Sequence, residues 1–260
     1  MPLLRIDDIH LAFGGVKAIN GVSIHVEKGK IHAIIGPNGA GKTSIFNCIS
    51  CVYKPQRGAV YFNDRKITGM KPDRVVHLGI ARTFQNIALF HHMTVLDNLM
   101  LGRHMYLKRG ALAGGVFLGP AQREEIENRR VVEDIIDFLE IENIRKKPVG
   151  TLAYGLRKRV ELARALSLKP KLLLLDEPMA GMNAEEKEDM ARFVLEIHAE
   201  RGTAVVMIEH DMGVVMELSD RVTVLNFGER IADGTPDEVR RNRDVQDAYL
   251  GEQHDLAADG

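Results

Sequence analysis

Apolar and polar residues alternate in two stretches near the start of the chain. Over residues 3–13 and 21–27, an apolar side chain recurs at about every second position. This period is typical of antiparallel strands with one face toward the core and one toward water. The sequence therefore predicts an antiparallel β region at the N-terminus.

Short apolar runs and helical periods predict the rest of a core. The four leucines at 172–175 suit a strand buried on both faces of a parallel sheet. Further strands are expected at 31–35, 58–62, 80–84 and 203–208, with a hairpin of 222–226 and 229–232 around Gly228. Helices are expected at 44–50 and 157–168. A third helix is expected to run to residue 200, with a capped start formed by Asn183 and Glu186.

The character of the chain changes between residues 86 and 154. Thr94 precedes a helical stretch at 95–101, and 121–140 is strongly helical. Residues 102–119 are glycine-rich near their end, and two interpretations stay open: a mobile or partner-docking loop, or disorder. We expect one α/β domain, with a core of 1–85 and 155–250, a helical subdomain of 86–154 and a frayed polar tail of 251–260.

Composition narrows the class of protein. The 260 residues are 45% hydrophobic and 27% charged, which allows a sizeable core. A net charge of −1 argues against a nucleic-acid partner, and the basic runs at 145–147 and 157–159 are expected to be solvated faces. No apolar run reaches the roughly 18 residues of a spanning helix, so we expect a protein made in the cytosol.

Residues 36–43 match the phosphate-loop pattern G-x-x-x-x-G-K-S/T and follow the apolar run at 31–35. A buried strand, a flexible loop and a helix N-terminus are what phosphate binding requires. Lys42 can reach the β and γ phosphates, and the Thr43 hydroxyl can ligate Mg²⁺. The predicted nucleotide-binding residues here are Gly36, Pro37, Asn38, Gly39, Ala40, Gly41, Lys42, Thr43 and Ser44.

Polar side chains at the ends of predicted strands supply further candidates. Asp176 can hold Mg²⁺ through water, and Glu177 can orient or deprotonate an attacking water. Gln85 can ligate Mg²⁺ or position a water, and His210 also follows a strand. Phe13, before a Gly-Gly turn, is either an adenine-stacking aromatic or a packing residue.

In their order and spacing, the phosphate loop, Gln85, residues 152–156, Asp176 with Glu177, and His210 resemble an ATP-binding cassette ATPase over the whole chain. The resemblance implies a RecA-like core with an N-terminal antiparallel β subdomain and a helical subdomain. It assigns adenine stacking to Phe13, a link from Mg²⁺ to the helical lobe to Gln85, and the catalytic carboxylate to Glu177. His210 becomes the histidine that contacts the γ phosphate.

Finer features resemble the ATPase subunits of branched-chain amino-acid importers, namely residues 82–86, 152–155, 176–183 and the long 102–119 insert. Such subunits work at the cytoplasmic face of a prokaryotic inner membrane, held there by two permeases, and receive solute through a periplasmic binding protein. The resemblance thus implies ATP and Mg²⁺ as cofactors, and permease subunits and a second ATPase subunit as partners.

The signature segment departs from the usual L-S-G-G-Q, because Ala153, Tyr154 and Leu156 replace the serine, the first glycine and the glutamine. Gly155 and the following helix remain, so Ala153 and Gly155 keep backbone contacts to the opposite subunit's ATP in this interpretation. The departure favours a heterodimer over a homodimer. The alternatives are a non-transport cassette ATPase, a cassette for another solute such as urea or lipid, and a small-molecule P-loop kinase.

Overall fold

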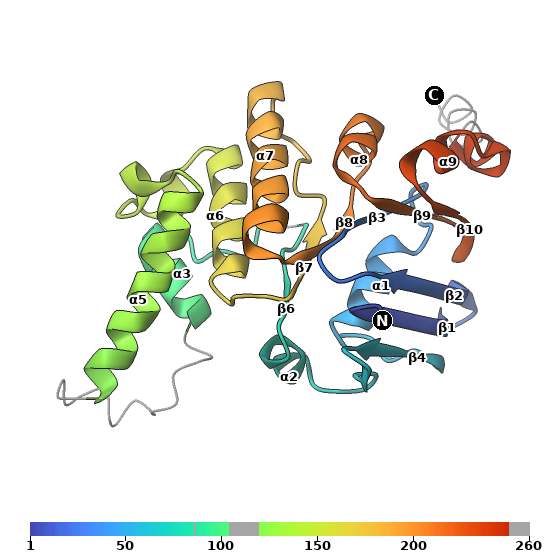
Figure 1. The fold of residues 1–260 in the computed structure, drawn as a ribbon, viewed down its shortest axis with the longest axis horizontal. Coiled ribbons are helices and arrows are strands. Elements are labelled where there is room, and N and C mark those ends of the chain that lie inside the picture. Colours follow the sequence, from blue (N-terminus) through green and yellow to red (C-terminus); the bar gives the residue numbers. More distant parts are fainter. Residues whose placement is uncertain (86, 104–119, 250–260) are drawn as a thin grey trace.

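Two β-sheets form the framework of the molecule, whose computed structural model describes residues 1–85, 87–103 and 120–249 (Figure 1). Within these residues the smaller sheet is antiparallel, with the strand order β2-β1-β4-β5. Its strands are β1 (Leu4–Phe13), β2 (Val16–Val26), β4 (Arg57–Phe62) and β5 (Arg65–Lys66). The antiparallel region predicted at the N-terminus is confirmed, although β2 begins earlier than its alternation suggested.

The larger sheet is parallel except at one edge. Its order is β10-β9-β3-β8-β7-β6, and only β10 pairs antiparallel, with β9. The strands are β3 (Ile31–Ile35), β6 (Ile80–Arg82), β7 (Leu172–Asp176), β8 (Ala204–Ile208), β9 (Arg221–Asn226) and β10 (Glu229–Gly234). Every residue of β7 is buried, which confirms the strand predicted from the four leucines. Because β3, β8 and β7 are neighbours, the segments that follow them share one edge of the sheet.

Helices and the smaller sheet cover the two faces of the larger sheet. Ile31 and Ile35 of β3 belong to a core shared with the helices α6 and α7, whereas Ile34 belongs to a second core shared with α1 and the smaller sheet. The predicted α/β fold is confirmed. The helices are α1 (Lys42–Ile49), α2 (Pro72–His77), α3 (Val95–Arg103), α5 (Pro120–Phe138), α6 (Tyr154–Leu166), α7 (Ala184–Arg201), α8 (Met212–Leu218) and α9 (Pro236–Arg240), with single 3-10 turns at η2 (Glu142–Ile144) and η3 (Val149–Thr151).

The helical region lies at one end of the molecule, where α3 and α5 stand next to α6, and β1 and β2 lie at the other end (Figure 1). The Thr94 hydroxyl accepts a hydrogen bond from the Asp97 N–H at 3.1 Å, so the predicted cap of α3 is confirmed. Asn183 and Glu186 form a reciprocal capping box at the start of α7, as predicted. Residues 104–119 of the insert, and the tail, lie outside the described residues. No helix in the described part of the chain is long and apolar enough to cross a membrane.

Candidate functional site

Glycines shape the loop between β3 and α1. Gly36 and Gly41 have φ angles of 147° and 100°. A Cβ at Gly36 would lie 2.0 Å from the carbonyl oxygen of Leu225, and one at Gly41 would lie 2.4 Å from that of Ala18. Neighbouring backbone therefore excludes any side chain at both positions. Gly39, with φ of 78°, has open space around it, so the tip of the loop can come close to a ligand.

Lys42 begins α1 and turns its side chain back into the loop. Its ammonium donates to the carbonyl oxygens of Gly36 and Pro37 at 2.7 and 2.8 Å. The side chain thus adds positive charge to a helix N-terminus that already favours anions. Of the other loop residues predicted to bind nucleotide, Asn38 and Thr43 are exposed, Ser44 is half-buried and Ala40 is buried.

The three predicted metal ligands, Thr43, Gln85 and Asp176, line one cavity. Asp176 is only 2% exposed, and its carboxylate pairs with the Arg82 guanidinium at 2.7 Å. A second guanidinium nitrogen donates to the Asn47 side chain at 2.7 Å, which ties the end of β7 to α1. Sequence reasoning gave Arg82 no role of its own. The structure shows that this arginine balances the charge of Asp176 inside the protein.

Glu177 follows β7 with an unusual backbone conformation. Its φ is 49°, in the left-handed region, and its N–H donates to the Ile208 carbonyl at 2.9 Å. Gln85 Nε2 donates to Glu177 Oε2 at 3.0 Å, and His210 Nε2 lies 2.8 Å from Oε1. Residues other than glycine held at positive φ cluster at functional sites. The structure therefore brings two predicted site residues, Gln85 and His210, from separate segments onto the carboxylate of a third, Glu177.

Glu209 is a site neighbour that sequence reasoning missed. It is 4% exposed, and its carboxylate accepts hydrogen bonds from the N–H groups of Met179 at 2.9 Å and His210 at 3.2 Å. Burial raises the pKa of Glu209, against the effect of these two N–H donors, and the charge of Glu177 raises it further. The side chain thus links the segment after Glu177 to His210. Its position between a buried strand and His210 was the available signal.

The prediction that residues 157–159 form a solvated face is wrong for two of them. Lys158 is 4% exposed, and its ammonium lies 3.3 Å from the carbonyl oxygens of both Gln85 and Glu177. The side chain of Arg159 is 15% exposed and pairs with Asp189 at 2.6 Å. The reason is the placement of α6, which packs against β6 and turns Lys158 toward the ends of β6 and β7 and Arg159 toward α7.

Phe13 ends β1 beside the first helix. The residue is 48% exposed, and its ring meets the ring of Tyr53 edge to face, with centroids 5.0 Å apart. The contact explains how the ring is held in place, and the exposed part is accessible to a stacking base. The sequence did not indicate Tyr53.

The altered signature segment starts α6. Ala153 is the exposed N-cap and makes no side-chain capping bond. A Cβ at Gly155 would lie 2.2 Å from the Glu186 carboxylate, so a larger residue there would have to displace that side chain from its place at the start of α7. The Tyr154 ring lies against Gly181, where a Cβ would be 3.1 Å away. None of these contacts joins Ala153 or Gly155 to the group around Glu177.

Family models and curated relatives match this chain along most of its length. The family model described as ABC transporter matches residues 19–180, and that described as Branched-chain amino acid ATP-binding cassette transporter matches residues 229–255. The high-affinity branched-chain amino acid transport ATP-binding protein BraF of Pseudomonas aeruginosa is 40% identical over 96% of this chain and 98% of its own length. The protein LivG of Escherichia coli, which carries the same description, is 39% identical with the same coverage.

Solved structures agree in fold over nearly the whole chain. A nucleotide-free ATP-binding cassette from an ABC transporter has a TM-score of 0.83 at 34% identity, covering 96% of this chain and 99% of that one. The ADP conformation of an ATP-binding cassette has a TM-score of 0.84 at the same identity and coverage. The family match over residues 19–180 includes Lys42, Gln85 and Glu177. The chain therefore belongs to the ABC transporter family.

Proposed function

We propose that this chain binds ATP with Mg²⁺, hydrolyses ATP, and thereby powers the import of branched-chain or related amino acids. The observation that carries the hydrolysis is the Glu177 carboxylate, held between Gln85 and His210 at the sheet edge that also bears the phosphate loop. The solute is inferred from the names of the relatives, so it rests on family membership rather than on the site.

The residues around the cavity fit a magnesium ion. Thr43, Gln85 and Asp176 offer a hydroxyl, an amide oxygen and a carboxylate, which are the oxygen ligands that Mg²⁺ prefers. Since Arg82 already takes one carboxylate oxygen of Asp176, we propose that Asp176 acts through a bound water. The ion would supply charge neutralisation on the phosphate oxygens. Lys42 adds a fixed positive charge on the loop side.

In the proposed reaction Glu177 orients the water that attacks the γ phosphorus and takes its proton, and ADP leaves as the bond to the γ phosphate breaks. Gln85 and His210 hold the two carboxylate oxygens of Glu177. The Glu177 side chain is therefore already oriented before the reaction begins. His210 is 43% exposed in its side chain and is accessible to the γ phosphate.

We further propose that two different cassettes pair, each completing the other's ATP site. The absence of a side-chain cap at Ala153 leaves the first N–H groups of α6 available to an anion. The serine hydroxyl of the usual signature is missing, however. The site completed by this chain would therefore hydrolyse ATP more slowly than the site built on this chain's own phosphate loop.

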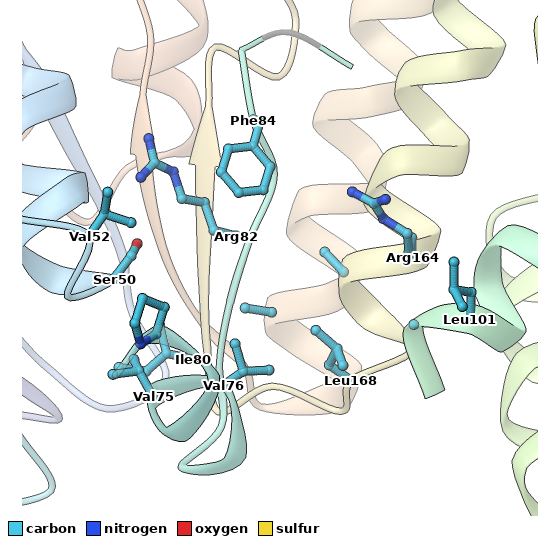
Figure 2. A pocket seen from close by; sticks show the side chains of 14 residues that line it. Ser50, Val52, Val75, Val76, Ile80, Arg82, Phe84, Leu101, Arg164 and Leu168 are labelled. Carbon is cyan, nitrogen blue, oxygen red and sulfur yellow. The ribbon is translucent and has the colours of Figure 1, made fainter. Parts of the chain in front are cut away.

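Permease docking is proposed at an apolar groove between α2 and β6 on one side and α3 and α6 on the other (Figure 2). The cavity measures about 320 Å³, and its walls include Val52, Val75, Val76, Leu101 and Leu168. Phe84, 44% exposed at the edge of the groove, directly precedes Gln85. We propose that an amphipathic helix from a cytoplasmic loop of the permease binds in this groove. A movement of that helix against Phe84 would be passed to the neighbouring Gln85. This docking would hold the chain at the cytoplasmic face of the inner membrane.

Reconstitution tests the proposal. The chain, a second cassette, the two permeases and the solute-binding protein are assembled in vesicles, and ATP hydrolysis and leucine uptake are measured together. We expect leucine to stimulate both, and Lys42→Ala to abolish both. ATP hydrolysis without uptake of leucine, isoleucine or valine would contradict the proposed substrate, and no hydrolysis at all would contradict the proposed activity.

A further inference from the structure

A buried lysine joins helix α6 to the site. Lys158 is 4% exposed, and its ammonium lies 3.3 Å from the carbonyl oxygens of Gln85 and Glu177. Burying an ammonium is unfavourable unless it is hydrogen-bonded and its charge is balanced. The two carbonyl oxygens supply such hydrogen bonds, which a solvated surface lysine would not need.

The two carbonyls belong to the residues whose side chains meet. Gln85 donates to the Glu177 carboxylate at 3.0 Å, and both main chains lie on the same ammonium. Glu177 is held at φ of 49°, an unfavourable conformation for a residue other than glycine, which persists only where the surrounding contacts hold the backbone in place. Ile208 holds its N–H, while Lys158 and the Ala180 N–H hold its carbonyl.

The same face of α6 also holds the chain on either side of Gln85. Glu161, 2% exposed, accepts hydrogen bonds from the N–H groups of Phe84 at 3.2 Å and Ala88 at 3.5 Å. Burial raises the pKa of Glu161, while the two N–H groups and the charge of Lys158 act in the opposite direction. The charge of Arg164 acts on Glu161 in the same direction as that of Lys158. Lys158 and Glu161, about one turn apart on α6, thus bind main-chain carbonyl and N–H groups respectively.

We infer that Lys158 is a positioning residue for the ATP hydrolysis proposed above, on which this inference rests: it holds Gln85 and Glu177 in register so that the amide stays on the carboxylate. Lys158 lies on the first turns of the helix that begins with the altered signature segment. A shift of α6 when this segment meets a second cassette would therefore reach Glu177 directly. The signature of this chain, which serves the partner's ATP, is linked in this way to the chain's own catalytic carboxylate.

The test uses Lys158→Met and Lys158→Arg in the assembled transporter, with kcat and KM for ATP measured separately. We expect Lys158→Met to lower kcat by about 10- to 100-fold, since small misplacement of catalytic groups has effects of this size. KM should change little, because Lys42 and Phe13 are untouched. Lys158→Arg keeps the charge and the donors and should retain more of the wild-type kcat than Lys158→Met.

Two controls separate positioning from a general structural effect. Arg159→Met removes a neighbouring cation that pairs with Asp189, and it should leave kcat near the wild-type value. In a Glu177→Gln background, Lys158→Met should cause no further loss, because residues that act as a unit are not additive. A wild-type kcat in Lys158→Met, or a full further loss in the Glu177→Gln background, would overturn the inference. Failure of the wild-type transporter to hydrolyse ATP would instead overturn the proposed function.

Discussion

Replacing Arg82 by methionine tests the buried ion pair beneath the site. The Arg82 and Asp176 side chains are 8% and 3% exposed, and the arginine also bonds Asn47 and lies over the rings of Phe46 and Phe84. Methionine fills a similar volume but leaves the carboxylate without its partner. Removing one member of a buried pair typically lowers the free energy of unfolding by about 3–5 kcal/mol. At roughly 2–4 °C per kcal/mol for a chain of this size, Tm should fall by about 6–20 °C.

Thermal unfolding followed by circular dichroism, without nucleotide, measures this shift. The matched control is Arg240→Met, which breaks a pair with Asp237 whose side chains are 68% and 73% exposed and should cost at most about 1 kcal/mol. Adding Asp176→Asn to Arg82→Met removes the unpaired charge and should recover part of the lost stability. The reasoning fails if Arg82→Met lowers Tm no more than Arg240→Met, or if the double variant is less stable than Arg82→Met alone.

Three further predictions concern the site and the signature. Glu177→Gln should leave ATP affinity intact and lower kcat by about 10²-fold or more, and a wild-type kcat would reject Glu177 as the base. Phe13→Ala should weaken ATP binding in equilibrium titration by roughly 1–3 kcal/mol, and unchanged affinities for ATP and GTP would make Phe13 a packing residue only. Gly155→Ala should raise Tm in a Glu186→Ala background, because alanine has about 1 kcal/mol more helix propensity than glycine. In the wild type Tm should not rise, because the added Cβ displaces the Glu186 side chain from the capping box at the start of α7. Equal effects in both backgrounds would argue against that contact.

Most strands and the longer helices could be predicted from local patterns of apolar and polar residues. The leucines of β7 and the apolar run of β3 were recognisable as strands, because a strand that is covered on both faces of a parallel sheet has a continuous run of apolar residues. The short helices α2, α8 and α9 were not predicted, because five to seven residues hold too little of a helical period. A signal existed for α9, since Thr235 and Glu238 form a capping box with Pro236 at the first position.

The charged residues around the site were harder to predict than its ligands. Lys158 lies in a basic run of a kind that is usually exposed, and nothing in the residues around Arg82 indicates that its charge is paired inside the protein. Their partners are distant, since Asp176 is 94 residues from Arg82 and Gln85 is 73 residues from Lys158. A charge looks the same in sequence whether it is solvated or paired inside the protein. Only the packing of α6 and β7 decides between these states.

The proposed asymmetry between two ATP sites and the proposed role of Lys158 meet in helix α6. The start of α6 carries Ala153 and would face the partner's ATP, whereas Lys158, further along, holds Glu177 at this chain's own ATP. A side-chain change at Ala153 leaves the hydrogen bonds of Lys158 in place, because they go to the carbonyl oxygens of Gln85 and Glu177, whereas a movement of the whole helix would reach both contacts. In the proposed heterodimer this chain would therefore keep a complete set of residues for hydrolysis at its own phosphate loop, even though it would offer a reduced signature to its partner.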